Sequence, residues 1–124
     1  MGLVEACELQ CECSPRIATA FRAGMGGHGE VCGALVGALM AFGLKFGRDR
    51  AEDTDAQSAT SERAGKLLQE FADEFGSVRC IDLTGCDMRT AEGSALAQEK
   101  DLRGAVCPEF VVFVAEKAQR LLDR

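Results

Sequence analysis

Seven cysteines are the side chains of this 124-residue chain best suited to chemistry, and they lie at positions 7, 11, 13, 32, 80, 86 and 107. A cysteine can pack as a small hydrophobic residue, bind a metal as a thiolate, or exchange electrons through a disulfide. The N-terminus shows no secretory signal, so we expect a reducing, cytoplasmic compartment, where structural disulfides do not persist. Redox or metal-binding chemistry is therefore the leading hypothesis for several of these thiols.

Three cysteines are predicted at the amino ends of helices. Cys32 follows a glycine-rich loop, Cys80 follows a Gly-Ser break, and Cys107 directly precedes Pro108. Free backbone N–H groups at a helix start favour negative charge, so the pKa of the Cys32 thiol is predicted to be lowered. If the fold gathers these ends, the thiolates could hold an iron–sulfur cluster or another metal ion, or exchange electrons as a disulfide.

The remaining candidates have weaker support. The chain has no C-x-x-C, and its cysteine spacings fit no standard ferredoxin or zinc-ribbon pattern. It also lacks C-x-x-C-H, so no attached haem is expected. These weaker candidates are Cys7, Cys11, Cys13, Cys86 and His28.

Residues 24–29, GMGGHG, match the dinucleotide pattern G-x-G-x-x-G by letter. That fingerprint needs a strand before the loop and a second strand after the helix, whereas helical patterns flank this loop on both sides. No Lys-Ser/Thr follows the glycines, so the loop is no P-loop either, and no nucleotide cofactor is expected. We predict instead that the loop forms part of the cysteine site through Gly26, Gly27, Gly29 and Glu30.

Helical periodicity dominates the chain. We expect short helices over 3–13, from Ser14-Pro15 and after Thr90, an amphipathic helix over about 64–75 with a Phe71 and Phe75 core stripe, and a last helix with an apolar face of Phe110, Val111, Val114, Ala118, Leu121 and Leu122. Residues 77–85 fit either a strand or a helical turn, and the acidic run 52–55 is predicted to be a solvated loop. The sequence predicts one all-α domain over residues 1–124, a compact multi-helix bundle.

The centre of this bundle is predicted to be a buried Gly/Ala-rich helix over about residues 30–46. Its small residues Gly33, Gly37 and Ala41 recur every four positions and would let another helix approach closely. Its uncharged stretch, 31–44, is shorter than the ~20 residues of a bilayer span. A net charge of −6 also argues against nucleic acid and anionic membranes as partners. A redox partner is expected but not identified, and the small-residue stripe leaves room for a homo-oligomer.

Three segments together suggest a family: GHGEVCGALVGALMAFGLKFG, VRCIDLTGCDMRTAEG and VCPEFV. They resemble, in the same order over roughly residues 14–122, the C-GCAxxG-C-C family of redox-active proteins. The resemblance implies that Cys32, Cys80 and Cys107 take the family's cysteine positions. It also implies electron transfer or an iron–sulfur role, because a related module of the split-Soret cytochromes has been proposed to hold a cluster.

Two features depart from that family pattern. The family usually opens with a further helix that carries a cysteine well before the glycine loop, and we expect this helix to be truncated or divergent here. Cys7, Cys11 or Cys13 would then substitute, or that ligand is missing. Cys86 is an additional cysteine at a position where the family requires none.

Two other function classes remain open at this stage. In the first, the cysteines only pack the core, and the protein is a non-catalytic helical interaction or oligomerisation module. In the second, His28 and Glu30 serve a metal-dependent enzyme, although a single histidine leaves the usual base-plus-nucleophile set incomplete. The sequence does not decide whether the protein is an enzyme.

Overall fold

The computed structural model describes residues 11–123, and every regular element in this range is helical. Within the described range the β pairing is limited to one isolated antiparallel bridge, between Val31 and Arg79. The all-α prediction is therefore confirmed, whereas the helix expected over 3–13 lies mainly outside the described residues. In chain order the elements are α2 (Ser14–Ala18), the 3-10 turn η1 (Thr19–Phe21), α3 (Gly33–Phe46), α4 (Thr54–Phe75), α5 (Cys80–Thr84), α6 (Ala91–Glu99), the π-turn η2 (Leu102–Val106) and α7 (Cys107–Leu122).

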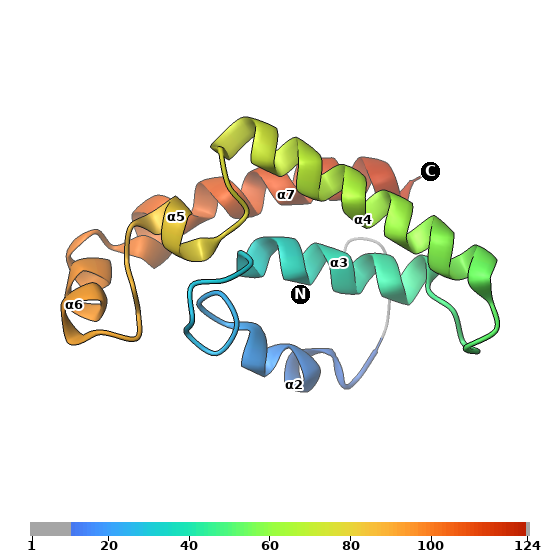
Figure 1. Ribbon diagram of the computed structural model, residues 1–124, viewed down its shortest axis with the longest axis horizontal. Helices are drawn as coiled ribbons and strands as arrows, with labels where there is room; N and C mark the ends of the chain where they lie inside the picture. The colour runs from blue at the N-terminus through green and yellow to red at the C-terminus, as the bar shows by residue number, and fades with distance from the viewer. Residues whose placement is uncertain (1–10, 124) are drawn as a thin grey trace.

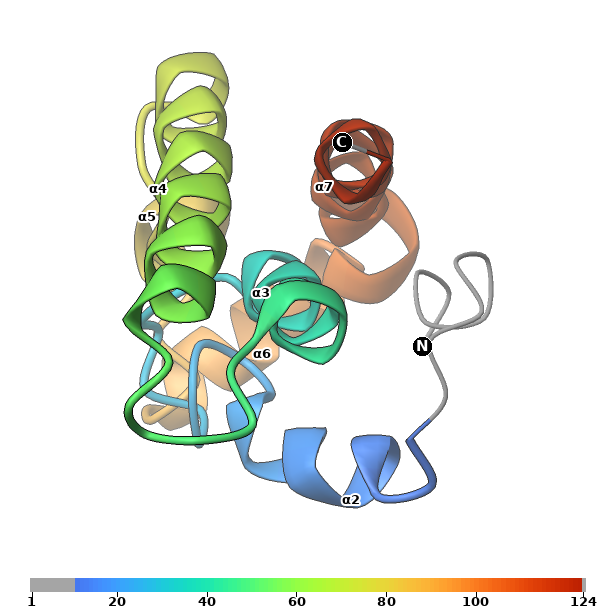
Figure 2. The ribbon, with the colours of Figure 1, turned by 90° about the vertical axis from the view of Figure 1, so that its right-hand side faces the viewer.

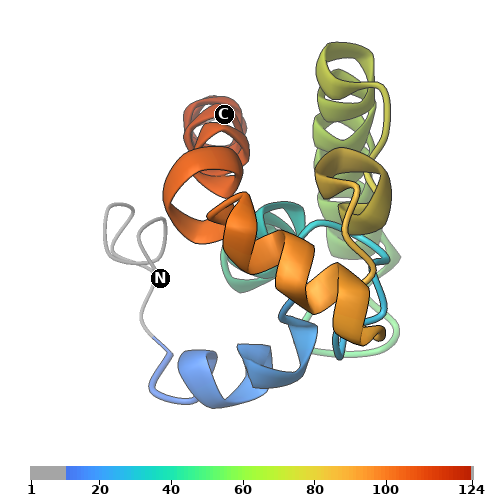
Figure 3. The same ribbon diagram turned by 90° about the vertical axis from the view of Figure 1, so that its left-hand side faces the viewer.

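Three long helices, α3, α4 and α7, pack against one another and build the core (Figures 1 and 2). The short helices α5 and α6 lie together at one end of this bundle, and α3 and α7 both begin at that same end (Figure 3). The starts of α3, α5 and α7 are therefore neighbours in space although they are far apart in the sequence.

The core is apolar and strongly aromatic near the C-terminal end of α4. Phe71 is fully buried, and its ring centroid lies 4.8 Å from that of Phe75 and 5.9 Å from that of Phe110. Such tilted aromatic pairs add to the stabilisation from burial alone. The predicted Phe71 and Phe75 core stripe is confirmed. The other fully buried side chains of the core are Leu35, Ala38, Ala41, Phe42, Leu67, Ala118 and Leu122.

Helix α3 is buried on a narrower face than predicted. It begins at Gly33, with Cys32 as its N-cap, and not at residue 30. Gly33 and Gly37 are exposed, and a Cβ placed on Gly37 would meet no atom within 4 Å. Among the described residues, the predicted stripe therefore serves no close helix contact at Gly37. The buried small residues that allow the helices to approach are Ala38 and Ala41.

Helix α4 begins about ten residues earlier than its hydrophobic pattern predicts. The acidic run 52–55 was expected to be a loop, but Asp53 is the N-cap and accepts a hydrogen bond from the Ala56 N–H at 3.0 Å. The first turns that follow are mostly polar and exposed, so periodicity of apolar residues cannot detect them. The helix ends where predicted, because Gly76 adopts the left-handed conformation with φ 84°.

The last two helices follow their predicted starts closely. Thr90 caps α6 by accepting a hydrogen bond from the Gly93 N–H at 2.9 Å, as expected. Pro108 predicts Cys107 as the N-cap of the last helix, but Cys107 is the first residue of α7 and the N-cap is Val106. Val111 was assigned to the apolar face but is 54% exposed. None of the helices in residues 11–123 is both long and apolar enough to cross a membrane.

Candidate functional site

A short backbone ladder joins the glycine-rich loop to the start of α5. The Cys80 N–H donates to the Glu30 carbonyl oxygen at 2.6 Å, and the Cys32 N–H donates to the Val78 carbonyl oxygen at 2.8 Å. The bridge described above lies between these two hydrogen bonds. Cys32 directly follows Val31, and Cys80 directly follows Arg79, the two residues of the bridge. Because side chains alternate along paired segments, the Cys32 and Cys80 side chains are both directed to the face opposite Val31 and Arg79.

The glycine-rich loop closes on itself before it reaches this ladder. The Glu30 N–H donates to the Gly24 carbonyl oxygen at 2.8 Å, and the Gly29 N–H donates to the Ala23 carbonyl oxygen at 3.2 Å. Gly24 has φ 71°, and a Cβ there would come within 2.6 Å of the Glu30 nitrogen. These loop N–H groups are therefore used internally, in contrast to a phosphate-binding loop, which presents them to a ligand.

Of the four loop residues predicted to form the site, two contact α5 and two lie in the turn away from it. Gly29 and Glu30 contact the start of α5 through their carbonyl oxygens. Gly26 and Gly27 both have positive φ, and neither brings a Cβ position near α5, so they shape the turn. The Glu30 side chain is exposed and forms an ion pair with Arg79 at 3.5 Å.

Four cysteines gather at the end of the bundle where α3, α5 and α7 begin. Cys32 caps α3, Cys80 and Cys107 are the first residues of α5 and α7, and Cys86 follows α5 after Gly85. Their thiolate charges are close enough to affect one another. Cys32 and Cys86 are buried, whereas Cys80 and Cys107 are half-buried.

The predicted lowering of the Cys32 pKa is wrong. Burial raises the pKa of the Cys32 thiol, although the backbone N–H groups of Ala34 and Leu35 at the start of α3 partly oppose this effect. The helix N-terminus therefore stabilises the thiolate as expected, but removal of the thiolate from water costs more. Sequence reasoning identified the favourable contribution and could not detect the depth of burial.

The thiols of Cys80 and Cys107 also have a raised pKa. For Cys80 the largest cause is desolvation, followed by the charges of Cys32 and Cys107, with a hydrogen bond from Thr84 in partial opposition. For Cys107 desolvation is again the largest cause, followed by the charges of Cys32 and Cys86. Each thiolate in this group therefore disfavours the formation of the next one.

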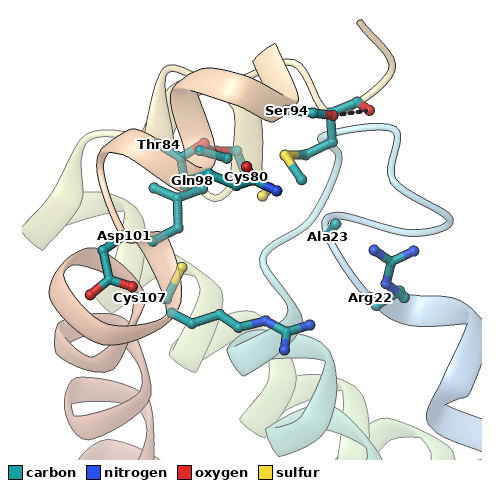
Figure 4. Close-up of a pocket in the computed structure, with 12 residues that line it drawn as sticks. Arg22, Ala23, Cys80, Thr84, Ser94, Gln98, Asp101 and Cys107 are labelled. Atoms are coloured by element: carbon teal, nitrogen blue, oxygen red, sulfur yellow. Dashed lines mark hydrogen bonds between the residues drawn. The ribbon is translucent and has the colours of Figure 1, made fainter. Parts of the chain in front are cut away.

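Cys80 and Cys107 line one open cavity of about 680 Å³ (Figure 4). Their side chains reach it from α5 and from the start of α7, and Ser94 and Gln98 of α6 also line it. This volume lies within the usual range of small-molecule pockets, ~300–1,000 Å³. The two half-buried thiols are therefore accessible to a small reactant.

The arrangement of donors does not make a ready metal site. In the described part of the chain, no group of three or more Cys, His, Asp or Glu side chains is placed so that it could hold one metal ion. A tetrahedral thiolate site would need sulfur atoms about 2.3 Å from a common centre. The donor set is chemically suited to a soft metal or a cluster, but the side chains would have to move to bind it.

The weaker candidates lie elsewhere or outside the described residues. The sulfur atoms of Cys11 and Cys13 are 2.7 Å apart, just before α2, and neither residue lines the cavity. The His28 ring is exposed, with Nδ1 3.2 Å from the Gly26 carbonyl oxygen. Cys7 falls outside residues 11–123.

The fold and the site define a cysteine-rich helical protein with four clustered thiols. Residues 1–121 match the family model described as "Putative redox-active protein (C_GCAxxG_C_C)", so the chain belongs to this family. This membership supports a redox role in general terms and confirms the resemblance predicted from the sequence. Searches of curated proteins and of solved structures gave no match.

Sequence reasoning missed the charged residues of the cavity. Arg22 directly follows η1, and Arg103 lies in the π-turn η2, yet both line the same cavity as Cys80 and Cys107. Neither arginine belongs to a motif, and nothing in the order of the sequence relates them. Their proximity follows only from the way α6 and η2 fold back toward the glycine-rich loop.

Proposed function

We propose that this protein is a thiol redox protein in which Cys80 and Cys107 form the reactive couple. The observation that carries the proposal is that two half-buried cysteines from separate helices line one cavity. A buried packing cysteine needs no access to solvent, whereas a thiol that exchanges with a disulfide does. Family membership supports a redox role of this general kind.

The reaction is a balanced exchange of two electrons and two protons. The thiolate of one cysteine attacks a sulfur of an external disulfide, forms a mixed disulfide, and releases one thiol. The second cysteine attacks the mixed disulfide, and the Cys80–Cys107 disulfide forms as the second thiol leaves. In total, two protein thiols and one disulfide give one protein disulfide and two thiols.

The two buried cysteines tune this couple. Negative charge on Cys32 raises the pKa of both Cys80 and Cys107. A disulfide between Cys80 and Cys107 carries no thiolate charge, so it avoids the repulsion that a dithiolate would experience in the cluster. Negative charge on Cys86 likewise raises the pKa of Cys80 and Cys107.

A second candidate function is electron transfer through an iron–sulfur cluster or another thiolate-bound metal. The effect of neighbouring cysteine charges on the pKa of Cys80 and Cys107 supports it, because a bound cation would neutralise those charges. Cys32, Cys80, Cys86 and Cys107 would be the ligands, after the side chains converge.

Oxidation followed by differential alkylation tests the proposed couple. We expect oxidised protein to contain a Cys80–Cys107 disulfide, detected by peptide mass spectrometry, and to regain two thiols on reduction. Cys80→Ser and Cys107→Ser should each abolish this two-electron step, whereas the control Cys86→Ala should keep it. An oxidised protein that lacks this link would overturn the proposal.

Anaerobic purification separates the two candidates. A cluster absorbs visible light and gives iron and sulfide on analysis, whereas a dithiol does neither. Visible absorption that disappears in Cys80→Ser would favour electron transfer through a cluster. Protein with neither a cluster nor an oxidisable couple would leave the helical interaction module as the better description, and light scattering would then report its oligomeric state.

A further inference from the structure

The cavity beside Cys80 and Cys107 contains two arginines that lack partners. In residues 11–123, Arg22 and Arg103 make no side-chain hydrogen bond or ion pair, although both line the cavity. By contrast, Arg79 pairs with Glu30 at 3.5 Å, and Arg89 pairs with Asp87 at 2.9 Å. Both side chains are exposed, so their charges face the solvent and the cavity.

The cavity does not neutralise these arginines by itself. The one acidic residue on its wall is Asp101, whose carboxylate lies against Gly104 in the adjacent turn. Figure 4 shows the Asp101 carboxylate and the Arg22 guanidinium on opposite sides of the cavity. The same cavity also has the neutral polar side chains of Ser94 and Gln98 on its wall. Positive charge therefore remains available to an occupant.

We propose that this cavity binds a small disulfide that carries carboxylates, and that Arg22 and Arg103 hold the carboxylates while a sulfur faces Cys80 or Cys107. This inference rests on the proposed function, because it names the substrate class of that couple. Arginine favours carboxylates through paired N–H donors, and its charge persists at any physiological pH. Cys80 and Cys107 supply the thiols that the disulfide oxidises, by the balanced exchange given above.

Three disulfides of nearly equal length test the charge preference. The probes are 3,3′-dithiodipropionate, with two carboxylates, hydroxyethyl disulfide, which is neutral, and cystamine, with two ammonium groups. We expect the reduced protein to react at least tenfold faster with the dicarboxylate than with the neutral probe, and slowest with cystamine. Added salt should reduce these differences, because it screens the arginine charges.

Substitutions assign the preference to the cavity. Arg22→Gln and Arg103→Gln should each slow the dicarboxylate reaction about tenfold, the usual effect of losing one charged hydrogen bond, and slow the neutral probe much less. Arg120→Gln is the matched control, because Arg120 is exposed in the last turn of α7 and does not line the cavity. Equal effects of Arg120→Gln and Arg22→Gln would overturn the inference.

A binding measurement distinguishes this inference from the redox proposal. The Cys80→Ser/Cys107→Ser double variant has no couple, so calorimetric titration with 3,3′-dithiodipropionate reports binding alone. Binding that weakens in Arg22→Gln supports the site even if the wild-type protein has no redox activity. If the wild-type protein exchanges with all three probes at one rate and the double variant binds none, the redox function stands and the carboxylate site is wrong. Circular dichroism verifies that each variant keeps its helical content.

Discussion

The N–H of Ile81 donates to the carbonyl oxygen of Gly29 at 3.0 Å, in direct contact between the glycine-rich loop and α5. Gly29 has φ 70°, and a Cβ at this position would lie 2.8 Å from the Cβ of Ile81. The loop can therefore approach α5 this closely only with glycine at position 29. The same contact holds Cys80 in register with Cys32, because the next hydrogen bonds of the ladder belong to these two residues.

Gly29→Ala should destabilise the fold by about 2–4 kcal/mol, because it adds both backbone strain and a steric clash with Ile81. Gly27→Ala is the control, since Gly27 has φ 79° but a Cβ there would meet no atom within 4 Å. It should cost only the strain, about 1 kcal/mol. Urea denaturation of the reduced proteins gives both values. Equal losses in the two variants would show that the contact with Ile81 is unimportant.

A second pair of glycines lies in helices and should respond in opposite directions. A Cβ on Gly93, in α6, would overlap the backbone of Asp87, so Gly93→Ala should lower the free energy of unfolding by about 2–3 kcal/mol. Gly65, in α4, is exposed and has open space at its Cβ position. Gly65→Ala should therefore raise stability by about 0.5–1 kcal/mol. Thermal denaturation measures both shifts, and destabilisation by Gly65→Ala would contradict the open surface of α4.

Local signals in the sequence predict much of this fold. The helices are located by apolar periodicity, the Thr90 cap, Pro108 and Gly76. Each of these signals depends only on residues that are close together in the sequence. The start of α4 escaped prediction because its first turns are polar, with the Asp53 cap as the remaining signal. The π-turn η2 also escaped, since no composition pattern distinguishes such a turn from a loop.

The site depends on contacts that the sequence does not encode locally. The cysteine positions and their helix starts were predictable, and so was the idea that these starts could meet. The direction of the thiol pKa shifts could not be predicted, because desolvation depends on how deeply the whole fold buries each thiol. Arg22 and Arg103 line one cavity that exists only after α6 and η2 have packed.

The raised thiol pKa values predict that the reduced protein loses stability in mild alkali. Below the ordinary thiol pKa, about 8.5, the thiols are protonated in both the folded and the unfolded chain, so their contribution is constant. At higher pH the unfolded chain releases protons first, because burial keeps the folded-state pKa of Cys32, Cys80 and Cys107 higher. The free energy of unfolding should therefore fall as the pH rises through the ordinary thiol pKa. The fall should stop once the pH is above the folded-state pKa values.

Melting temperatures between pH 7 and pH 10 measure this loss under reducing conditions. The chain has no Tyr, which removes one other group that titrates in this range. Cys32→Ala should reduce the slope of Tm against pH, since it removes one shifted thiol and the charge that acts on Cys80 and Cys107. A Tm that rises with pH, or a slope unaffected by Cys32→Ala, would be inconsistent with the buried cluster.

Accessibility within the cluster should divide the four thiols into two pairs. Cys80 and Cys107 line the open cavity, whereas Cys32 is 8% exposed and Cys86 only 1%. In the native reduced protein, iodoacetamide should therefore label Cys80 and Cys107 at least about tenfold faster than the buried pair, whose labelling needs local opening. Peptide mass spectrometry at timed intervals gives the four rates, and labelling in urea provides the reference in which they should converge. Fast native labelling of Cys86 would mean that the end of the bundle is open, and the division into a reactive and a buried pair would then be wrong.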